Sequence, residues 1–309
     1  MKPAGTRIDV LLSTFNGSAY VREQIASILG QEGVEACILA RDDGSTDSTQ
    51  GILEEYANSL PGRFILIREP QGNLGIIRSY EVLLAASGGR YIAFADQDDV
   101  WDRLKLAKSF ELLLTLEGDG RVPALVYTDL RIVSESLALK DESFFSYMGI
   151  DPLRALSMKS LSVQNSVVGC TTLFNRALAD VAQPFPAACL MHDWWLALCA
   201  AQFGRTAYLP EATISYRQHG ANAVGARTVV SRLRSIWRRK NSTFKSIDQA
   251  LALLDRHSPV PAGTTDAGFL TGLKSHTSTI GKKMFLLENG ALKNGLLRNL
   301  YFFLLARSN

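Results

Sequence analysis

The chain has 309 residues, of which 47% are hydrophobic and 20% are charged. These values exclude an intrinsically disordered chain, and the length suits one large α/β domain with an appendage or two small domains. Residues 1–226 hold 19 Lys or Arg against 26 Asp or Glu, a net charge of −7, whereas the residues from Arg227 onward hold 14 against 4, a net charge of +10. This asymmetry favours metal-dependent chemistry in an acidic body and attachment of a basic tail to an anionic surface.

The cysteines and the apolar runs bear on the cellular compartment. Four cysteines are scattered with no CxxC pair, a pattern that favours reduced thiols in a cytosolic protein over a disulfide framework or a zinc site. The first residues show no signal peptide, and the apolar run 300–306 is too short to span a bilayer. We therefore expect a cytoplasmic protein that is associated with the inner face of the cytoplasmic membrane through its tail.

The first part of the chain repeats a pattern of apolar strand, polar loop and amphipathic helix four times. Strands are predicted at 7–14, 34–40, 64–67 and 91–95, and the last of the four helices at 103–116. This alternation indicates a parallel sheet wound with helices.

The next part of the chain is more mixed. A strand is predicted at 124–128, a core strand at 167–174, a helix at 191–202 and a strand at 206–216. Residues 141–162 are predicted to be a flexible segment.

Three carboxylates within four residues follow the fourth predicted strand, at Asp96, Asp98 and Asp99. Carboxylates this close repel one another, and near a core strand each also loses solvation. A divalent cation such as Mg²⁺ or Mn²⁺ relieves both costs, because it takes oxygen ligands and bridges to a substrate phosphate. The alternative is a solvated acidic turn in which Asp99 or Asp102 caps the following helix.

Polar clusters follow all four predicted strands. They are Thr14 with Asn16, Asp42 with Asp43, Asn73 with Gly75, and the acidic cluster at 96–99. In a parallel sheet these positions share one edge, where ligands bind, so the sequence predicts a nucleotide-sized ligand. No GxGxxG follows the first strand and no GxxxxGK[ST] occurs, so neither a Rossmann site nor a P-loop is present.

With these residues assembled, the chain resembles family 2 glycosyltransferases of the GT-A fold over residues 7–222. The motifs that carry the resemblance are Thr14-Phe15-Asn16, Asp42-Asp43-Gly44-Ser45-Thr46-Asp47, Asn73-Leu74-Gly75, Asp96-Gln97-Asp98-Asp99, His192-Asp193 and His219. The run 95–101 and the His-Gly-x-Asn ending look like bacterial rhamnosyltransferase-type enzymes. The resemblance implies an α/β fold with a mostly parallel nucleotide-binding sheet flanked by helices. It also implies a catalytic domain at 1–222, with a donor half at about 1–128 and an acceptor half at about 129–222, and a basic helical region at 223–309.

The resemblance also implies roles for the donor-side residues. Asp98 is the expected direct metal ligand and His219 a distal one, with Asp96 toward the metal or the ribose. Asp43 and Thr14 are expected to face a pyrimidine base. The remaining expected donor contacts are Asn16, Asp42, Asn73, Gly75 and Arg78. The alternative for Arg78 is that its side-chain stem packs on the sheet. Arg78-Ser79-Tyr80 stands where this family motif commonly ends in Ala-Arg-Asn.

On the acceptor side, the resemblance makes Asp193 the general base that takes the proton of the attacking hydroxyl. His192 departs from the acidic residue that usually precedes this aspartate. An alternative is that Asp193 only stabilises the first turn of its helix. Trp194 and Trp195 are either core residues or a stacking surface for a sugar.

The resemblance predicts an inverting, metal-dependent glycosyltransferase with Mn²⁺ or Mg²⁺ as cofactor. It moves a sugar, first of all L-rhamnose from dTDP-rhamnose, onto a cell-surface polysaccharide or a polyprenyl-diphosphate-linked glycan. The alternative within enzymes is a UDP-hexose or UDP-GlcNAc donor. The alternative of another class is a catalytically silent scaffold in a polysaccharide assembly complex.

The basic tail allows several partners. Residues 229–240 form a predicted amphipathic basic helix of the kind that lies on anionic membranes, and Lys282–Arg307 repeat the pattern. Packing on the catalytic domain or a homodimer interface are the alternatives. Nucleic acid is disfavoured, because no recognition module is visible.

Overall fold

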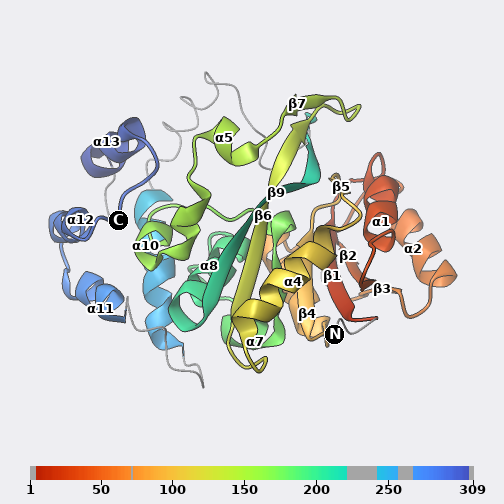
Figure 1. The fold of residues 1–309 in the computed structure, drawn as a ribbon, viewed down its shortest axis with the longest axis horizontal. Coiled ribbons are helices and arrows are strands. Elements are labelled where there is room, and N and C mark those ends of the chain that lie inside the picture. Colours follow the sequence, from red (N-terminus) through yellow and green to blue (C-terminus); the bar gives the residue numbers. More distant parts are fainter. Residues whose placement is uncertain (1–4, 71, 221–241, 257–266, 306–309) are drawn as a thin grey trace.

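The computed structural model describes residues 5–70, 72–220, 242–256 and 267–305, and these form an α/β fold around one sheet (Figure 1). The strand order is β3-β2-β1-β4-β8-β6-β9-β5, with β7 paired to β6. The strands are β1 (Arg7–Thr14), β2 (Glu35–Asp42), β3 (Phe64–Leu66), β4 (Tyr91–Ala95), β5 (Val100–Trp101), β6 (Ala124–Val133), β7 (Leu139–Asp141), β8 (Leu173–Asn175) and β9 (Arg205–Arg217). All four strands of the predicted repeat are present, and they pair in parallel as expected.

Helices cover both faces of the sheet (Figure 1). They are α1 (Val21–Leu29), α2 (Thr49–Ser59), α3 (Ile76–Ala86), α4 (Lys105–Glu117), α5 (Phe144–Met148), α6 (Met158–Leu161), α7 (Arg176–Ala182) and α8 (His192–Phe203). Side chains alternate along β1, so that Leu11 joins the core under α3 and α8 while Val10 and Leu12 join the core under α1, α2 and α4. The sheet therefore separates two hydrophobic clusters, which is typical of a doubly covered parallel sheet.

The strand pairing changes from parallel to antiparallel next to β4. There β8 pairs antiparallel to β4 and also antiparallel to β6, which in turn pairs in parallel with β9. This insertion places the elements after residue 124 beside the carboxyl end of β4. The acidic loop after β4 is thereby flanked by both halves of the chain.

The structure corrects the predicted core strand at 167–174. Gly169–Thr171 form a short 3₁₀ turn, and the strand itself begins only at Leu173. The hydroxyls of Thr171 and Thr172 donate back to the carbonyls of Val168 and Gly169 at 2.7 Å, which stabilises a turn in place of a ladder.

The prediction of a flexible segment at 141–162 is also wrong. The segment contains α5, a 3₁₀ helix at Pro152–Leu156 and α6, each capped by a serine or aspartate side chain. Phe145, Met158 and Leu161 are buried in the core on the α8 side. The segment is therefore packed into the hydrophobic cluster that includes α8.

Four further helices follow the sheet in the described part of the chain. They are α10 (Ser242–Leu251), α11 (Ala267–Ser275), α12 (Thr279–Glu288) and α13 (Leu296–Leu305), and they gather at the end of the molecule away from β3 (Figure 1). Ile247, Leu270 and Phe302 are buried in the same cluster as α8. The basic helix predicted at 229–240 lies outside the described residues. Among the described helices, none is long and apolar enough to cross a membrane.

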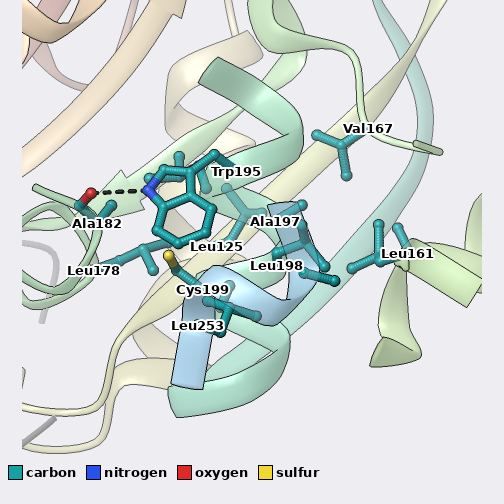
Figure 2. Close-up of a cluster of buried hydrophobic side chains, with 14 of the residues drawn as sticks. Leu125, Leu161, Val167, Leu178, Ala182, Trp195, Ala197, Leu198, Cys199 and Leu253 are labelled. Carbon is teal, nitrogen blue, oxygen red and sulfur yellow. Dashed lines mark hydrogen bonds between the residues drawn. The ribbon is translucent and has the colours of Figure 1, made fainter. Parts of the chain in front are cut away.

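Trp195 lies at the centre of this cluster (Figure 2). Its side chain is fully buried beside Leu178, Cys199 and Leu253, and its indole N–H donates to the carbonyl of Ala182 at 2.8 Å. The expectation that Trp195 contributes to the acceptor side is therefore corrected, because the ring has no surface left to offer a sugar.

Truncation of Trp195 should be costly. We expect Trp195→Ala to lower the free energy of unfolding by about 3–5 kcal/mol, because it opens a cavity and leaves the Ala182 carbonyl without its donor. Trp194→Ala is the matched control, since Trp194 is only partly buried and its loss should cost less. Urea denaturation of both variants measures the difference, and equal losses would contradict this assignment of the core.

Candidate functional site

The acidic loop after β4 contacts a histidine that follows β9. Asp98 and Asp99 are buried, Asp96 is partly exposed, and the Nε2 atom of His219 lies 2.8 Å from an Oδ2 oxygen of Asp98. The two residues are 121 positions apart in sequence, and β9 ends just before His219. Asp98 and His219, two of the three predicted metal ligands, are thus in direct contact.

Burial is the main influence on the pKa values of this loop, and the mutual repulsion of its carboxylates adds to it. Burial, and then the charge of Asp98, raises the pKa of Asp96 to about 6. Burial, and then the charges of Asp96 and Asp98, raises the pKa of Asp99 well above its usual range. A bound cation would reverse both effects by stabilising the ionised carboxylates.

The residues present fit a divalent cation. Ligand atoms of Asp96, Asp99 and Cys170 all lie within 4.8 Å of one another, and Asp99 Oδ2 is buried without a hydrogen-bond partner in the described part of the chain. Carboxylate oxygens and an imidazole nitrogen suit Mn²⁺ or Mg²⁺ when a substrate phosphate completes the shell. Cys170 was not among the predicted site residues, because a single cysteine in a predicted strand carries no ligand spacing.

The alternative of a helix-capping acidic turn is not what the structure shows. Helix α4 begins at Lys105 after Leu104, which makes no side-chain cap. Asp102 instead pairs with Arg131, and Asp99 accepts a hydrogen bond from the backbone N–H of Arg217 at 3.3 Å. Neither aspartate therefore caps α4.

A buried lysine, Lys105, lies close to Asp99 of the acidic loop. The Nζ atom of Lys105 lies 3.8 Å from the ring centroid of Trp101 and has no hydrogen-bond partner among the described residues. Burial lowers its pKa to about 7, against the opposing effects of Cys170 and Asp99. Lys105 therefore supplies only part of the positive charge that this cluster needs. Lysines near helix starts are common, and no pattern in the sequence distinguished this one.

Two polar side chains fix the path of the acidic loop. The Gln97 amide pairs with Phe15, since Oε1 accepts from the Phe15 N–H at 2.9 Å and Nε2 donates to the Phe15 carbonyl at 3.0 Å. A Cβ on Gly17 would lie 2.2 Å from Gln97 Oε1, so a larger residue at this position would displace the Gln97 amide. From the other side, buried Arg217 donates through Nε to the Asp98 carbonyl at 3.0 Å.

The loops after β1 and β2 are joined through the predicted donor residues. Thr14 Oγ1 donates to Asp42 at 2.9 Å, and Asp42 accepts from the Ser45 N–H at 2.8 Å. The side-chain oxygen of Asn16 accepts from the Thr46 N–H at 2.8 Å. Thr14, Asn16 and Asp42 therefore form one hydrogen-bonded unit at the carboxyl edge of the sheet.

Asp43 anchors the third loop. Its carboxylate accepts from the N–H groups of Leu74 at 2.7 Å and Gly75 at 2.9 Å, and it forms an ion pair with Arg41. Gly75 has φ 75°, a conformation that favours glycine. Arg41 is buried and also forms an ion pair with Glu69. Its position at the end of a predicted strand did not indicate these two ion pairs.

Asn73 lies on this third loop, where its backbone and side chain face Gly44 of the second loop. Arg78 is not part of this network. It is half exposed on α3 and forms an ion pair with Glu81 one turn further along the helix.

Asp193 lies in the first turn of α8 and is buried. One carboxylate oxygen accepts from the Gly169 N–H at 3.0 Å, and the other accepts from the Trp194 N–H at 2.6 Å and from Asn165 at 3.3 Å. Burial raises the pKa of Asp193 to about 7, against the opposing backbone hydrogen bond from Trp194. A carboxylate with this pKa is matched to taking a proton from a hydroxyl near neutral pH.

A stack of rings connects Asp193 with the acidic loop. The His192 ring lies 3.9 Å from that of Tyr80, and the Tyr80 hydroxyl donates to the Ala95 carbonyl at 2.7 Å, with Asp96 Oδ1 3.2 Å away. His192 is buried, neither of its ring nitrogens has a hydrogen-bond partner within the described ranges, and burial lowers its pKa to about 3. His192 is therefore neutral, and in this structure it faces Tyr80. Tyr80 was missed, although it lies in the triplet that departs from the family pattern.

Only one of the paired tryptophans is partly exposed. Trp194 is partly exposed, and its indole N–H donates to the Leu161 carbonyl at 2.7 Å. This hydrogen bond fixes the ring next to Asp193.

A search against family models matches residues 9–179, more than half of the chain, to the model described as Glycosyl transferase family 2. An uncharacterized protein of Mycobacterium tuberculosis is 30% identical over 69% of this chain and 59% of its own length, so the chain spans about six tenths of that relative. The dTDP-rhamnosyl transferase RfbG of Shigella flexneri is 26% identical over 70% of this chain and 74% of its own length.

Among solved structures, the chain resembles the mannosyltransferase PcManGT from Pyrobaculum calidifontis in complex with GDP-Man and Mn²⁺. The TM-score is 0.53 at 18% identity, over 92% of this chain and 85% of that structure. At this identity the likeness concerns the fold.

The acidic loop should bind Mn²⁺ in the absence of any substrate. We expect Asp98→Asn to weaken Mn²⁺ binding by at least about tenfold, because it removes one charged oxygen at the point where the loop meets His219. Asp180→Asn is the matched control, since Asp180 is exposed on α7. Calorimetric titration with MnCl₂ measures both, and an unchanged affinity in Asp98→Asn would contradict the assignment.

The buried neutral His192 should make the fold sensitive to acid. The unfolded histidine has its ordinary pKa of about 6.5, whereas burial lowers the folded pKa to about 3. Between these values the unfolded chain binds the extra proton, so stability falls as the pH drops. His192→Phe should lose less stability than the wild type between about pH 7 and about pH 5, as measured by urea denaturation. Equal losses would show that His192 carries no such penalty.

Proposed function

The chain belongs to glycosyl transferase family 2 and has the GT-A fold, and on this premise we propose that it is an inverting, metal-dependent enzyme that moves a sugar from a nucleotide donor to a glycan hydroxyl. The observation that carries the proposal is the convergence of two groups of carboxylates. Asp98, which lies between Asp96 and Asp99 in the acidic loop, contacts His219, and the Tyr80 and His192 rings lie between Asp96 and the start of α8, where Asp193 lies.

We propose Asp96, Asp98 and His219 as the residues that would hold the cation, with Asp99 and Cys170, whose ligand atoms lie within 4.8 Å of that of Asp96, as further candidates. A bound Mn²⁺ or Mg²⁺ would stabilise the negative charge of the departing nucleoside diphosphate. The joined loops that carry Thr14, Asn16, Asp42 and Asp43 support a donor site at the same edge.

Asp193 performs the proton transfer. The acceptor hydroxyl gives its proton to the Asp193 carboxylate while its oxygen forms a bond to the anomeric carbon. The bond from that carbon to the donor phosphate oxygen breaks with both electrons, and the nucleoside diphosphate leaves from the opposite face. The configuration at the anomeric carbon is therefore inverted. The exposed edge of Trp194 beside the base suits contact with the acceptor sugar.

Our first candidate for the donor is dTDP-L-rhamnose. It is supported by the likeness to a relative named as a dTDP-rhamnosyl transferase. A UDP-hexose or UDP-GlcNAc is the second candidate. The acceptor is a cell-surface polysaccharide or a polyprenyl-diphosphate-linked glycan. We further propose a catalytic domain at 1–222, with donor and acceptor halves that meet near residue 128, followed by a helical region.

A catalytically silent scaffold is disfavoured by the chemistry of the site. A protein that only binds partners has no use for several desolvated carboxylates, each of which costs free energy in the absence of a cation. The Asp193 carboxylate, whose pKa is raised to about 7, is a further feature of a working site.

The donor and the need for a metal are tested by calorimetry with a panel of dTDP- and UDP-sugars, with Mn²⁺ and then with EDTA. We expect dTDP-rhamnose to bind only with the metal, and Asp98→Asn to abolish that binding. Preferred binding of a UDP-hexose would retain the mechanism and overturn rhamnose. If no nucleotide sugar binds with or without metal, the enzyme proposal fails.

The base is tested by the pH dependence of transfer. Since the base must be deprotonated and the pKa of Asp193 is about 7, kcat/KM should fall below about pH 7 and level off above it. Asp193→Asn should lower transfer by several orders of magnitude and leave donor binding unchanged. Residual transfer near the wild-type level in this variant would assign the proton to another group.

A further inference from the structure

The C-terminal helices carry an unusual concentration of exposed apolar side chains. Six of the fifteen large hydrophobic residues that are exposed in the described part of the chain lie on α12 and α13, with exposed fractions from 43% to 81%. We call these six the leucine face: Ile280, Met284, Leu287, Leu296, Leu297 and Leu300.

The leucine face follows the helical repeat. Ile280, Met284 and Leu287 are spaced four and three residues apart, so they lie on one side of α12, whereas Leu286 on another side is fully buried. On α13, Leu296, Leu297 and Leu300 share one side, and Phe302 is fully buried. Each helix therefore has an inner apolar side that is packed and an outer apolar side that is not.

The two helices are held next to each other. Lys283 Nζ on α12 donates to the Phe303 carbonyl on α13 at 2.7 Å, and the Lys293 ammonium lies 5.2 Å from the ring centroid of Phe302. Both helices lie at the outer end of the molecule in Figure 1, away from the strands of the donor half. The leucine face is thus presented by two adjacent helices.

The charge around the leucine face is strongly positive. Residues 267–305 contain five Lys or Arg and one acidic residue, a net charge of +4. Lys274 is exposed at the end of α11, and Lys282, Lys283, Lys293 and Arg298 are partly exposed. Exposed leucines among basic side chains are the combination that binds anionic lipid surfaces. A second copy of the chain would bring two positive surfaces together, so charge complementarity favours lipid.

We propose that the leucine face docks on an anionic lipid membrane. The apolar side chains enter the boundary between headgroups and acyl chains, while the flanking lysines contact the headgroups. This contact is a property of the C-terminal helices and does not depend on the proposed transferase activity.

Vesicle cosedimentation of the full chain tests the proposal. We expect binding to vesicles of equal parts phosphatidylcholine and phosphatidylglycerol to exceed binding to phosphatidylcholine alone by at least about tenfold, and to weaken in high salt. Leu296→Ser with Leu297→Ser should reduce binding to the anionic vesicles by at least about tenfold, since both side chains are exposed and their loss leaves the inner packing intact.

The matched control is Leu114→Ser with Leu139→Ser, which removes two exposed leucines from α4 and β7. It should bind vesicles as the wild type does. Lys274→Gln with Lys282→Gln should weaken binding to anionic vesicles only.

Three outcomes would overturn the proposal. In the first, the wild type does not bind anionic vesicles. In the second, the Leu296/Leu297 variant binds as well as the wild type, which would assign binding to charge elsewhere in the chain. In the third, that variant converts a dimer into a monomer in size-exclusion chromatography while vesicle binding is unchanged, which would assign the leucine face to a second copy.

Discussion

The crowding of carboxylates after β4 is the constraint on which the rest of this site depends. Asp96, Asp98 and Asp99 are held together at the end of a buried strand, where repulsion and loss of solvation both oppose ionisation. The surroundings counter this with fixed groups. Gln97 attaches the loop to the chain after β1, and Arg217 supports it from β9. Contacts to both halves of the sheet thus hold the acidic loop in place, and a bound cation would offset the remaining repulsion.

The antiparallel insertion of β8 explains how one loop can serve two halves of the molecule. Because β8 lies beside β4, the turn at Gly169–Thr171 that precedes it meets both the acidic loop and the start of α8. The Gly169 N–H holds the Asp193 carboxylate, and Cys170 next to it approaches Asp96 and Asp99. A side chain at position 169 would meet His192 and Asp193, so glycine is needed for this close approach.

The sequence was most informative where a local pattern determines the outcome. The four strand-loop-helix repeats predicted the parallel half of the sheet, and polar residues at strand ends identified its carboxyl edge. Contacts between distant positions were not predictable in this way. The insertion of β8, the burial of Arg41 and Lys105, and the stacking of Tyr80 on His192 all depend on tertiary packing that no periodicity encodes. The paired tryptophans show the same limit, since only the fold decides which ring is buried.

His192, which stands where the family pattern has an acidic residue, has an electrostatic consequence for Asp193, the proposed base. An acid beside Asp193 would add a second negative charge, and the raised pKa would then come from repulsion as well as burial. His192 is instead neutral, because burial against Tyr80 and Phe94 lowers its pKa to about 3. The pKa of Asp193 is therefore set first by its own burial, with the charge of Asp96 as a smaller contribution. A cation that neutralised Asp96 would remove this charge repulsion, and the pKa of Asp193 would fall by a correspondingly small amount.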